Sequence, residues 1–144
     1  MAGNRAVRSD PDPERLRAEL SEGLRVVNEA AAGPYHDAPL SLSVRDDKGA
    51  LIGGLSGLFY WNVLHVHQLW VAEHHRHAGC GTALLSRAEE IAAERGCDVI
   101  FLDTYTFQAP GFYRKRGYTA LGSMTDAPKG FETMWFAKRL NGTR

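Results

Sequence analysis

The spacing of apolar residues predicts a helix at the start of the chain. Apolar residues recur there at helical spacing: Leu16, Leu20, Leu24 and Val27. Asp12 can cap a helix, Pro13 suits its first turn, and Gly33 can end it. The pattern predicts a helix over residues 13–31, preceded by a flexible N-terminus over residues 1–11.

The next part of the chain alternates apolar and polar residues as strands do. The alternation begins at Leu40, and a turn containing Asp46 and Gly49 separates the first run from a second. We expect three strands in an antiparallel meander: 40–45, 50–61 and 63–71.

Helical spacing returns at Gly79, and helices and strands then alternate. An unbroken apolar run from Val99 to Leu102 predicts a strand covered on both faces, as in a parallel pair. The further expected elements are helices over 79–95 and 109–116 and strands over 98–103, 118–123 and 131–140. The sequence therefore predicts an α/β fold over residues 12–144, a single domain with a mixed sheet and helices on both faces.

Composition and charge exclude several classes of protein. The 144 residues suit one domain, and seventeen basic residues balance seventeen acidic ones. This balance argues against binding nucleic acid by bulk charge. The two cysteines build no disulfide framework, and no apolar stretch approaches the roughly 18 residues of a membrane helix. The N-terminus resembles no signal peptide, so we expect a cytoplasmic protein with no nucleic-acid or membrane partner.

The densest chemical signal lies just before helix 79–95. It comprises Arg76, His77, Ala78, Gly79, Cys80, Gly81 and Thr82. A helix start offers unpaired N–H groups, glycines let the backbone approach an anion, and the guanidinium of Arg76 suits phosphate oxygens. The segment predicts a pyrophosphate cradle, with a simple turn as the alternative. A Walker A loop is excluded, because no lysine separates Gly81 from Thr82.

A dinucleotide-binding Rossmann site is the main rival interpretation. Gly79 and Gly81 follow a strand and open a helix, and Asp103 ends the next strand at about the ribose-binding distance. Against this interpretation, Leu84 occupies the position of the third glycine, and a whole loop separates Val71 from the glycines.

Two motifs resemble those of the GNAT N-acyltransferase superfamily. The first comprises Leu69, Val71, Arg76, Gly79, Gly81, Leu84 and Leu85. The second comprises Ala109, Phe112, Tyr113, Gly117 and Tyr118. Their order and spacing fit that family over roughly residues 13–140. The resemblance implies an acetyl-CoA-dependent N-acetyltransferase that works by direct attack in a ternary complex, without a metal.

The resemblance also implies how acetyl-CoA would bind. The backbone of Leu69, Trp70 and Val71 would pair with the pantetheine arm like an extra strand, and the amides of residues 77–82 would hold the pyrophosphate. The thioester would enter a cleft between strands 63–71 and 98–104. The family has a β-bulge on the earlier strand, and the apolar phase here shifts between Val66 and Leu69. A polar Gln68 on a buried face would explain the same shift.

Acetyl transfer needs a neutral amine, a stabilised carbonyl oxygen and a proton for the leaving thiolate. By resemblance, Tyr113 is the expected acid, and the backbone amide of Leu69 or Val71 is the expected oxyanion donor. His67 is our first choice of base, since an imidazole beside the cleft can accept the amine proton. His65 on the same strand, water, or a strand histidine with no role are the alternatives.

Metal and covalent chemistry are not expected. Five of the six histidines lie between residues 65 and 77, but no acidic or cysteine ligand accompanies them at ligand spacing. Neither Cys80 nor Cys97 has an obvious activating base.

The chain departs from the family pattern at two points. Thr106 stands where many members have asparagine, and the usual N-terminal first strand is not evident. The expected acceptor is a small-molecule or peptide amine, with its side of the cleft lined by Tyr60, Trp61, Gln108 and residues 124–130. Trp135 and Phe136 could support a homodimer. A non-catalytic acyl-CoA-binding module on the same fold is the alternative function.

Overall fold

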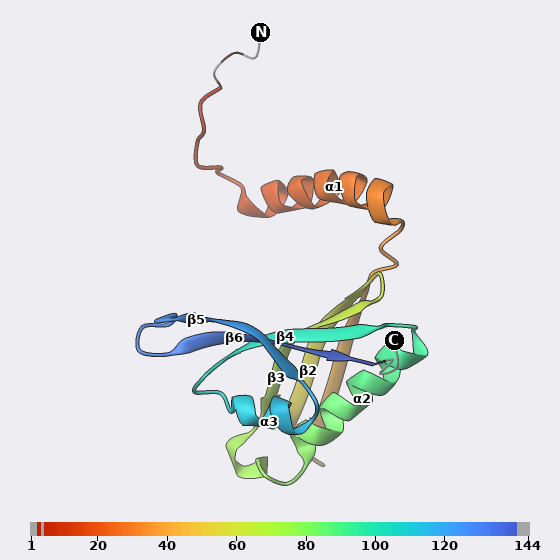
Figure 1. Cartoon of the computed structure of the whole chain (residues 1–144), viewed down its shortest axis with the longest axis vertical. Coiled ribbons are helices and arrows are strands. Elements are labelled where there is room, and N and C mark those ends of the chain that lie inside the picture. Colours follow the sequence, from red (N-terminus) through yellow and green to blue (C-terminus); the bar gives the residue numbers. More distant parts are fainter. Residues whose placement is uncertain (1–2, 4, 141–144) are drawn as a thin grey trace. The chain divides into compact units, whose positions relative to one another are not determined.

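A computed structural model describes residue 3 and residues 5–140, which divide into two compact units at Tyr35 (Figure 1). The first unit contains helix α1 (Pro13–Ala32). The Asp12 carboxylate caps the helix by accepting a hydrogen bond from the Arg15 N–H at 3.1 Å. At the other end, the Asn28 side-chain amide donates to the Tyr35 hydroxyl at 2.7 Å. The predicted first helix and its cap are therefore present.

The second unit begins at His36 and is built on a six-stranded mixed sheet of order β1-β2-β3-β4-β6-β5. Its strands are β1 (Ala38–Arg45), β2 (Leu51–Tyr60), β3 (Val63–Val71), β4 (Val99–Tyr105), β5 (Thr119–Thr125) and β6 (Glu132–Arg139). Its helices are η1 (Glu73–His75), α2 (Cys80–Glu94) and α3 (Pro110–Lys115).

The pairing of the strands decides between the two predicted folds. β1, β2 and β3 form the expected antiparallel meander. β3 and β4, which helix α2 connects in the sequence, pair directly and in parallel. The other described pairs are antiparallel. A Rossmann domain has a mostly parallel sheet, whereas only one pair is parallel among the described strands here. The interpretation of the glycines as a dinucleotide-binding Rossmann site is therefore wrong.

The core fills the space between the sheet and helix α2. Leu84, Leu85 and Ala88 of α2 are buried, and they meet sheet residues such as Ile100 and Phe136, which have no exposed surface. Burying one such leucine contributes roughly 1.5–3 kcal/mol. Figure 1 shows α2 and α3 on the same side of the sheet. The predicted α/β fold, a mixed sheet with helices packed on it, is confirmed.

Two irregularities open one end of the sheet. Ser56 pairs with Gln68 but Gly57 pairs with Val66, which leaves His67 as the extra residue of a β-bulge in β3. The bulge predicted from the apolar phase is confirmed. In addition, the parallel pairing of β3 with β4 runs only over residues 63–65 and 99–101 among the described residues. Beyond these pairs, the two strands continue without hydrogen bonds to each other.

None of the helices over the described residues combines the length and apolar composition needed to cross a bilayer.

Candidate active site

A groove of about 690 Å³ lies where β3 ends and where α2 and α3 begin. It collects most of the residues that the sequence predicted for the cofactor: Leu69, Val71, Arg76, His77, Gly79, Cys80, Gly81, Thr82 and Tyr113. Trp70 and Ala78 do not line it. The two predicted motifs, which are about 30 residues apart in the sequence, therefore form one site.

One end of the groove is the exposed start of helix α2. Gly79 has φ +86°, a left-handed conformation that glycine adopts without strain, and no side chain caps the helix. The first helical hydrogen bond runs from the Ala83 N–H to the Gly79 carbonyl at 2.9 Å. The amides of residues 80–82 therefore have no acceptor within the helix, which is the arrangement that binds phosphate.

Cationic and imidazole side chains surround this helix start. They are His75, Arg76, His77, Lys115 and Arg116, and no carboxylate is among the described residues that line the groove. The Arg76 Nε donates to the Val71 carbonyl at 3.0 Å, which holds this guanidinium beside the end of β3. The groove is thus electrostatically suited to a ligand with several phosphate charges.

Arg116 fastens the two helical walls of the groove together. Its Nε donates to the Thr82 hydroxyl at 3.1 Å, a second N–H from Nη2 reaches the same oxygen, and Nη1 donates to the Phe112 carbonyl at 2.9 Å. The guanidinium lies 3.8 Å from the centre of the Phe112 ring, and a Cβ at Gly81 would stand 3.4 Å from that ring. A Cβ at this position would thus be at ordinary van der Waals distance from the ring, and the hydrogen bonds of Arg116 join α3 to the start of α2.

Tyr113 of α3 also lines the groove. Its side chain is only 8% exposed and packs between the rings of Tyr118 and Phe136, whose centres lie 5.9 and 5.8 Å away. Burial raises the pKa of the Tyr113 phenol above its usual value of 10.0, so the phenol is protonated at neutral pH. A fixed, protonated donor therefore shares the groove with Leu69 of β3.

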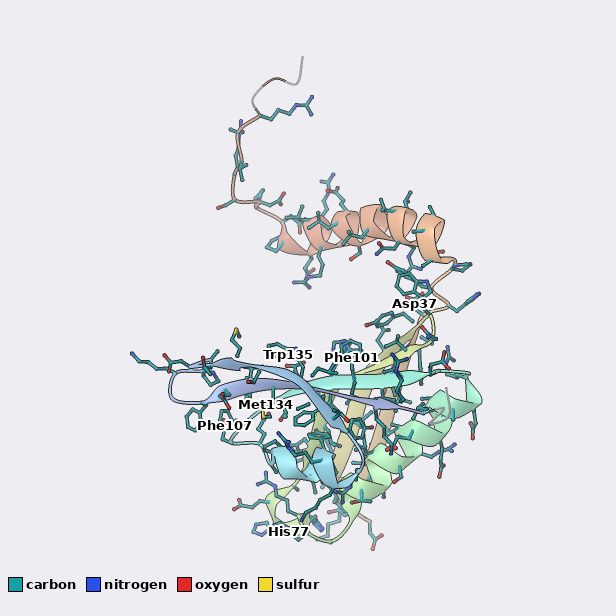
Figure 2. All side chains as sticks on the ribbon, in the orientation of Figure 1. Asp37, His77, Phe101, Phe107, Met134 and Trp135 are labelled. Atoms are coloured by element: carbon teal, nitrogen blue, oxygen red, sulfur yellow. The ribbon has the colours of Figure 1, made fainter. Side chains whose placement is uncertain are left out.

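The predicted base lies outside this groove. His67 is the exposed bulge residue, and its ring meets the ring of His65 edge-on at 4.5 Å. His65 also stacks on Phe101 at 4.1 Å. Burial and the neighbouring His67 lower the pKa of His65, against an opposing effect of Asp103, so His65 is neutral near pH 7. Figure 2 shows Phe101 and Trp135 on the sheet face away from α2 and α3.

The structure separates the residues predicted to contact the acceptor. Gln108 lines the groove, and its side-chain oxygen accepts from the Thr104 hydroxyl at 3.1 Å. Tyr60 pairs with Val63, so it and Trp61 lie at the closed end of the β2–β3 hairpin, far along the strands from the bulge. These two aromatic residues do not line the groove.

Thr106 has a structural role here. Its N–H donates to the Glu132 carbonyl at 3.0 Å, and its hydroxyl accepts from the Glu132 N–H at 3.1 Å. It ties the end of β4 to β6. Over the residues that the structure describes, no group of three or more His, Cys, Asp and Glu side chains could hold a metal ion.

Sequence reasoning missed the bracket formed by Arg116. Sequence spacing alone does not show that Thr82 would lie opposite Arg116, because the two residues are 34 positions apart. The one sequence feature that pointed to Arg116 was its position inside the second motif, between Tyr113 and Gly117.

Known proteins resemble this chain in sequence and in structure. A model of the Acetyltransferase (GNAT) family matches residues 5–118. Blasticidin-S acetyltransferase of Streptomyces morookaense is 43% identical over 95 residues, which are 65% of this chain and 70% of that protein. The crystal structure of an acetyltransferase from Bacillus cereus matches with a TM-score of 0.82 and 34% identity, over 94% of this chain and 97% of that one.

A more distant structure shares the fold. It is an aminoglycoside 6′-N-acetyltransferase complexed with coenzyme A, at a TM-score of 0.63 and 19% identity, over 96% of this chain and 98% of that one. Together with the groove and its two motifs, the family match gives the identification: the chain belongs to the GNAT acetyltransferase family.

Proposed function

We propose that the protein is an N-acetyltransferase that moves the acetyl group of acetyl-CoA to an amine by direct attack in a ternary complex. The observation that carries this proposal is the groove. An uncapped helix start with cationic neighbours and the buried phenol of Tyr113 line the same groove.

The cofactor would lie along the groove. The amides from His77 to Thr82 hold the pyrophosphate, with Arg76 beside them. The pantetheine arm carries amide groups, and it pairs with the backbone of residues 69–71, where β3 has no hydrogen bonds to β4. The distant relative that was crystallised with coenzyme A supports this choice of ligand.

The chemistry then uses the open end of the sheet. The amine attacks the thioester carbonyl, and the backbone N–H of Leu69 or Val71 stabilises the oxygen as it gains charge. The C–S bond breaks as the Tyr113 hydroxyl gives its proton to the sulfur. The proton lost by the amine goes to His67, or to water. Tyr113 lines the groove and His67 does not. The acid would therefore act on the sulfur of the cofactor, and the base would act on the amine of the acceptor.

The acceptor is a small-molecule or peptide amine. The relative from Streptomyces morookaense, which by its name acetylates blasticidin S, favours a small molecule. A homodimer remains a prediction, but Phe136 is fully buried and could not contribute to its interface. The cytoplasmic location also remains a prediction.

Thermal shift with acetyl-CoA, CoA and NAD tests the proposal, followed by detection of free thiol with a panel of amines. A ligand present at a hundred times its Kd stabilises the folded state by about 2.7 kcal/mol, which is several degrees in Tm. We expect shifts with acetyl-CoA and CoA but none with NAD, and thiol release that depends on the amine. Binding without thiol release from any amine would instead indicate the non-catalytic acyl-CoA-binding module.

A further inference from the structure

A carboxylate lies beside the histidine pair on the sheet face away from the groove. Along β4, Leu102 and Thr104 are buried, so alternation places Asp103 and Tyr105 on the face of Phe101. Asp103 is exposed, and it is close enough to His65 to act on that imidazole electrostatically. Both Asp103 and Tyr105 lie beyond the last residue of β4 that pairs with β3.

Three exposed aromatic side chains lie where β4 ends, two of them close to Asp103 in the sequence. We call Tyr105, Phe107 and Phe131 the aromatic rim; their exposed fractions are 37%, 54% and 46%. The rings of Tyr105 and Phe107 stack at 5.1 Å, and Phe107 meets Phe131 edge-on at 4.9 Å. Figure 2 shows Phe107 near the β5–β6 hairpin. A contiguous set of exposed rings that the core does not use is typical of a binding surface.

The rim adjoins the groove through one short segment. Gln108 lines the groove, and it is bonded to Thr104, which directly precedes Tyr105. The Tyr105 N–H also donates to the Gln108 side chain at 3.4 Å. A molecule on the rim is thus next to the groove.

We propose that the acetyl acceptor is a flat-ringed organic cation, an amine that carries a flat ring and a second positive charge, held by the Asp103 carboxylate and the aromatic rim. A carboxylate attracts the charge, while exposed π faces favour both a cation and a flat ring. A saturated polyamine would use Asp103 alone, and a simple aromatic monoamine would use the rim alone. This inference rests on the proposed N-acetyltransferase function and names its substrate class.

Three matched amines test it. p-Xylylenediamine has the ring and both charges, 4-methylbenzylamine lacks the second charge, and 1,4-bis(aminomethyl)cyclohexane lacks the flat ring. We expect kcat/KM for the first to exceed that for each of the others by about fivefold or more, the effect of one partly exposed charge pair or one aromatic contact.

Two variants assign the effect to residues. Asp103→Asn should remove the preference for the diamine over the monoamine, whereas Asp47→Asn, in the exposed β1–β2 turn, should leave it intact. Phe107→Leu should narrow the preference for the flat ring over the saturated one. Equal rates for the three amines, no transfer to any of them, or an unchanged charge preference in Asp103→Asn would overturn the inference. If acetyl-CoA still binds in that case, only the proposed class of acceptor is wrong. If acetyl-CoA does not bind, the proposed N-acetyltransferase function is wrong.

Discussion

The two sides of the open end of the sheet differ in the groups that they present to a ligand: backbone on one side and side chains on the other. On the groove side, the anion site is made of backbone: the amides at the start of α2, the left-handed turn at Gly79 and the unpaired edge of β3. On the opposite side, His65, His67 and Asp103 present side chains, and the aromatic rim lies beyond them where β4 ends. The difference indicates that the first side suits one constant ligand, while the second side can change its ligand by substitution without disturbing the first.

Replacing Tyr113 by phenylalanine should give the largest effect on the groove side. The ring still fills its site between Tyr118 and Phe136, but the proton donor is gone. We expect kcat to fall by about 10²–10⁴-fold, with acetyl-CoA affinity retained. Steady-state kinetics together with calorimetric titration would measure both quantities.

Tyr118→Phe is the matched control, because it removes a phenol that is equally buried but does not line the groove. An unchanged kcat in Tyr113→Phe would exclude Tyr113 as the acid.

His67→Gln tests the opposite side. Loss of a general base should lower kcat/KM at pH 7 by about 10²-fold, and the defect should shrink toward pH 10 as more of the amine becomes neutral. His65→Gln is the control from the same strand. If kcat/KM falls by less than threefold, or if the fall is the same at every pH, the proton of the amine goes to water and not to His67.

Gly79→Ala tests whether the backbone forms the anion site. A Cβ there would meet no heavy atom within 4 Å, so the substitution acts through the left-handed backbone alone. Its strain of about 1–2 kcal/mol should weaken acetyl-CoA binding by about tenfold.

Gly122→Ala in β5 is the control. A Cβ at Gly122 would also meet no heavy atom within 4 Å, but the residue has no positive φ, so this variant should bind acetyl-CoA as the parent protein does. Equal affinities in the two variants would show that the conformation at Gly79 does not support the site.

Tyr118→Phe should have the smallest effect. The Tyr118 hydroxyl is buried without a hydrogen-bond partner among the described residues, and burial together with nearby Glu89 raises its pKa. At pH 7.5 the free energy of unfolding should change by less than about 1 kcal/mol.

At alkaline pH the same variant should be more stable than the parent protein. Above pH 10 the unfolded phenol ionises while the folded one stays protonated, so Tyr118 lowers stability as pH rises, and the variant escapes that loss. Urea unfolding at pH 7.5 and 10.5 measures both values; a loss above 2 kcal/mol at pH 7.5 would show that the hydroxyl is bonded.

The elements and the groove were predictable because their signals are local. Gly79 and Gly81 mark the helix start, and the phase shift between Val66 and Leu69 marks the bulge, since each feature depends on neighbouring residues. The bracket between Arg116 and Thr82 and the contact of Phe107 with Phe131 join segments that are distant in the sequence. Local patterns carry no information on such pairs, so the sequence did not show that Tyr60 and Trp61 would lie away from the groove.

The most direct test is a crystal structure of the protein with acetyl-CoA. The account predicts that the pyrophosphate lies within hydrogen-bond distance of the amides of residues 80–82, and that the thioester sulfur lies within about 4 Å of the Tyr113 hydroxyl. A pyrophosphate bound elsewhere, or a sulfur directed away from Tyr113, would contradict it.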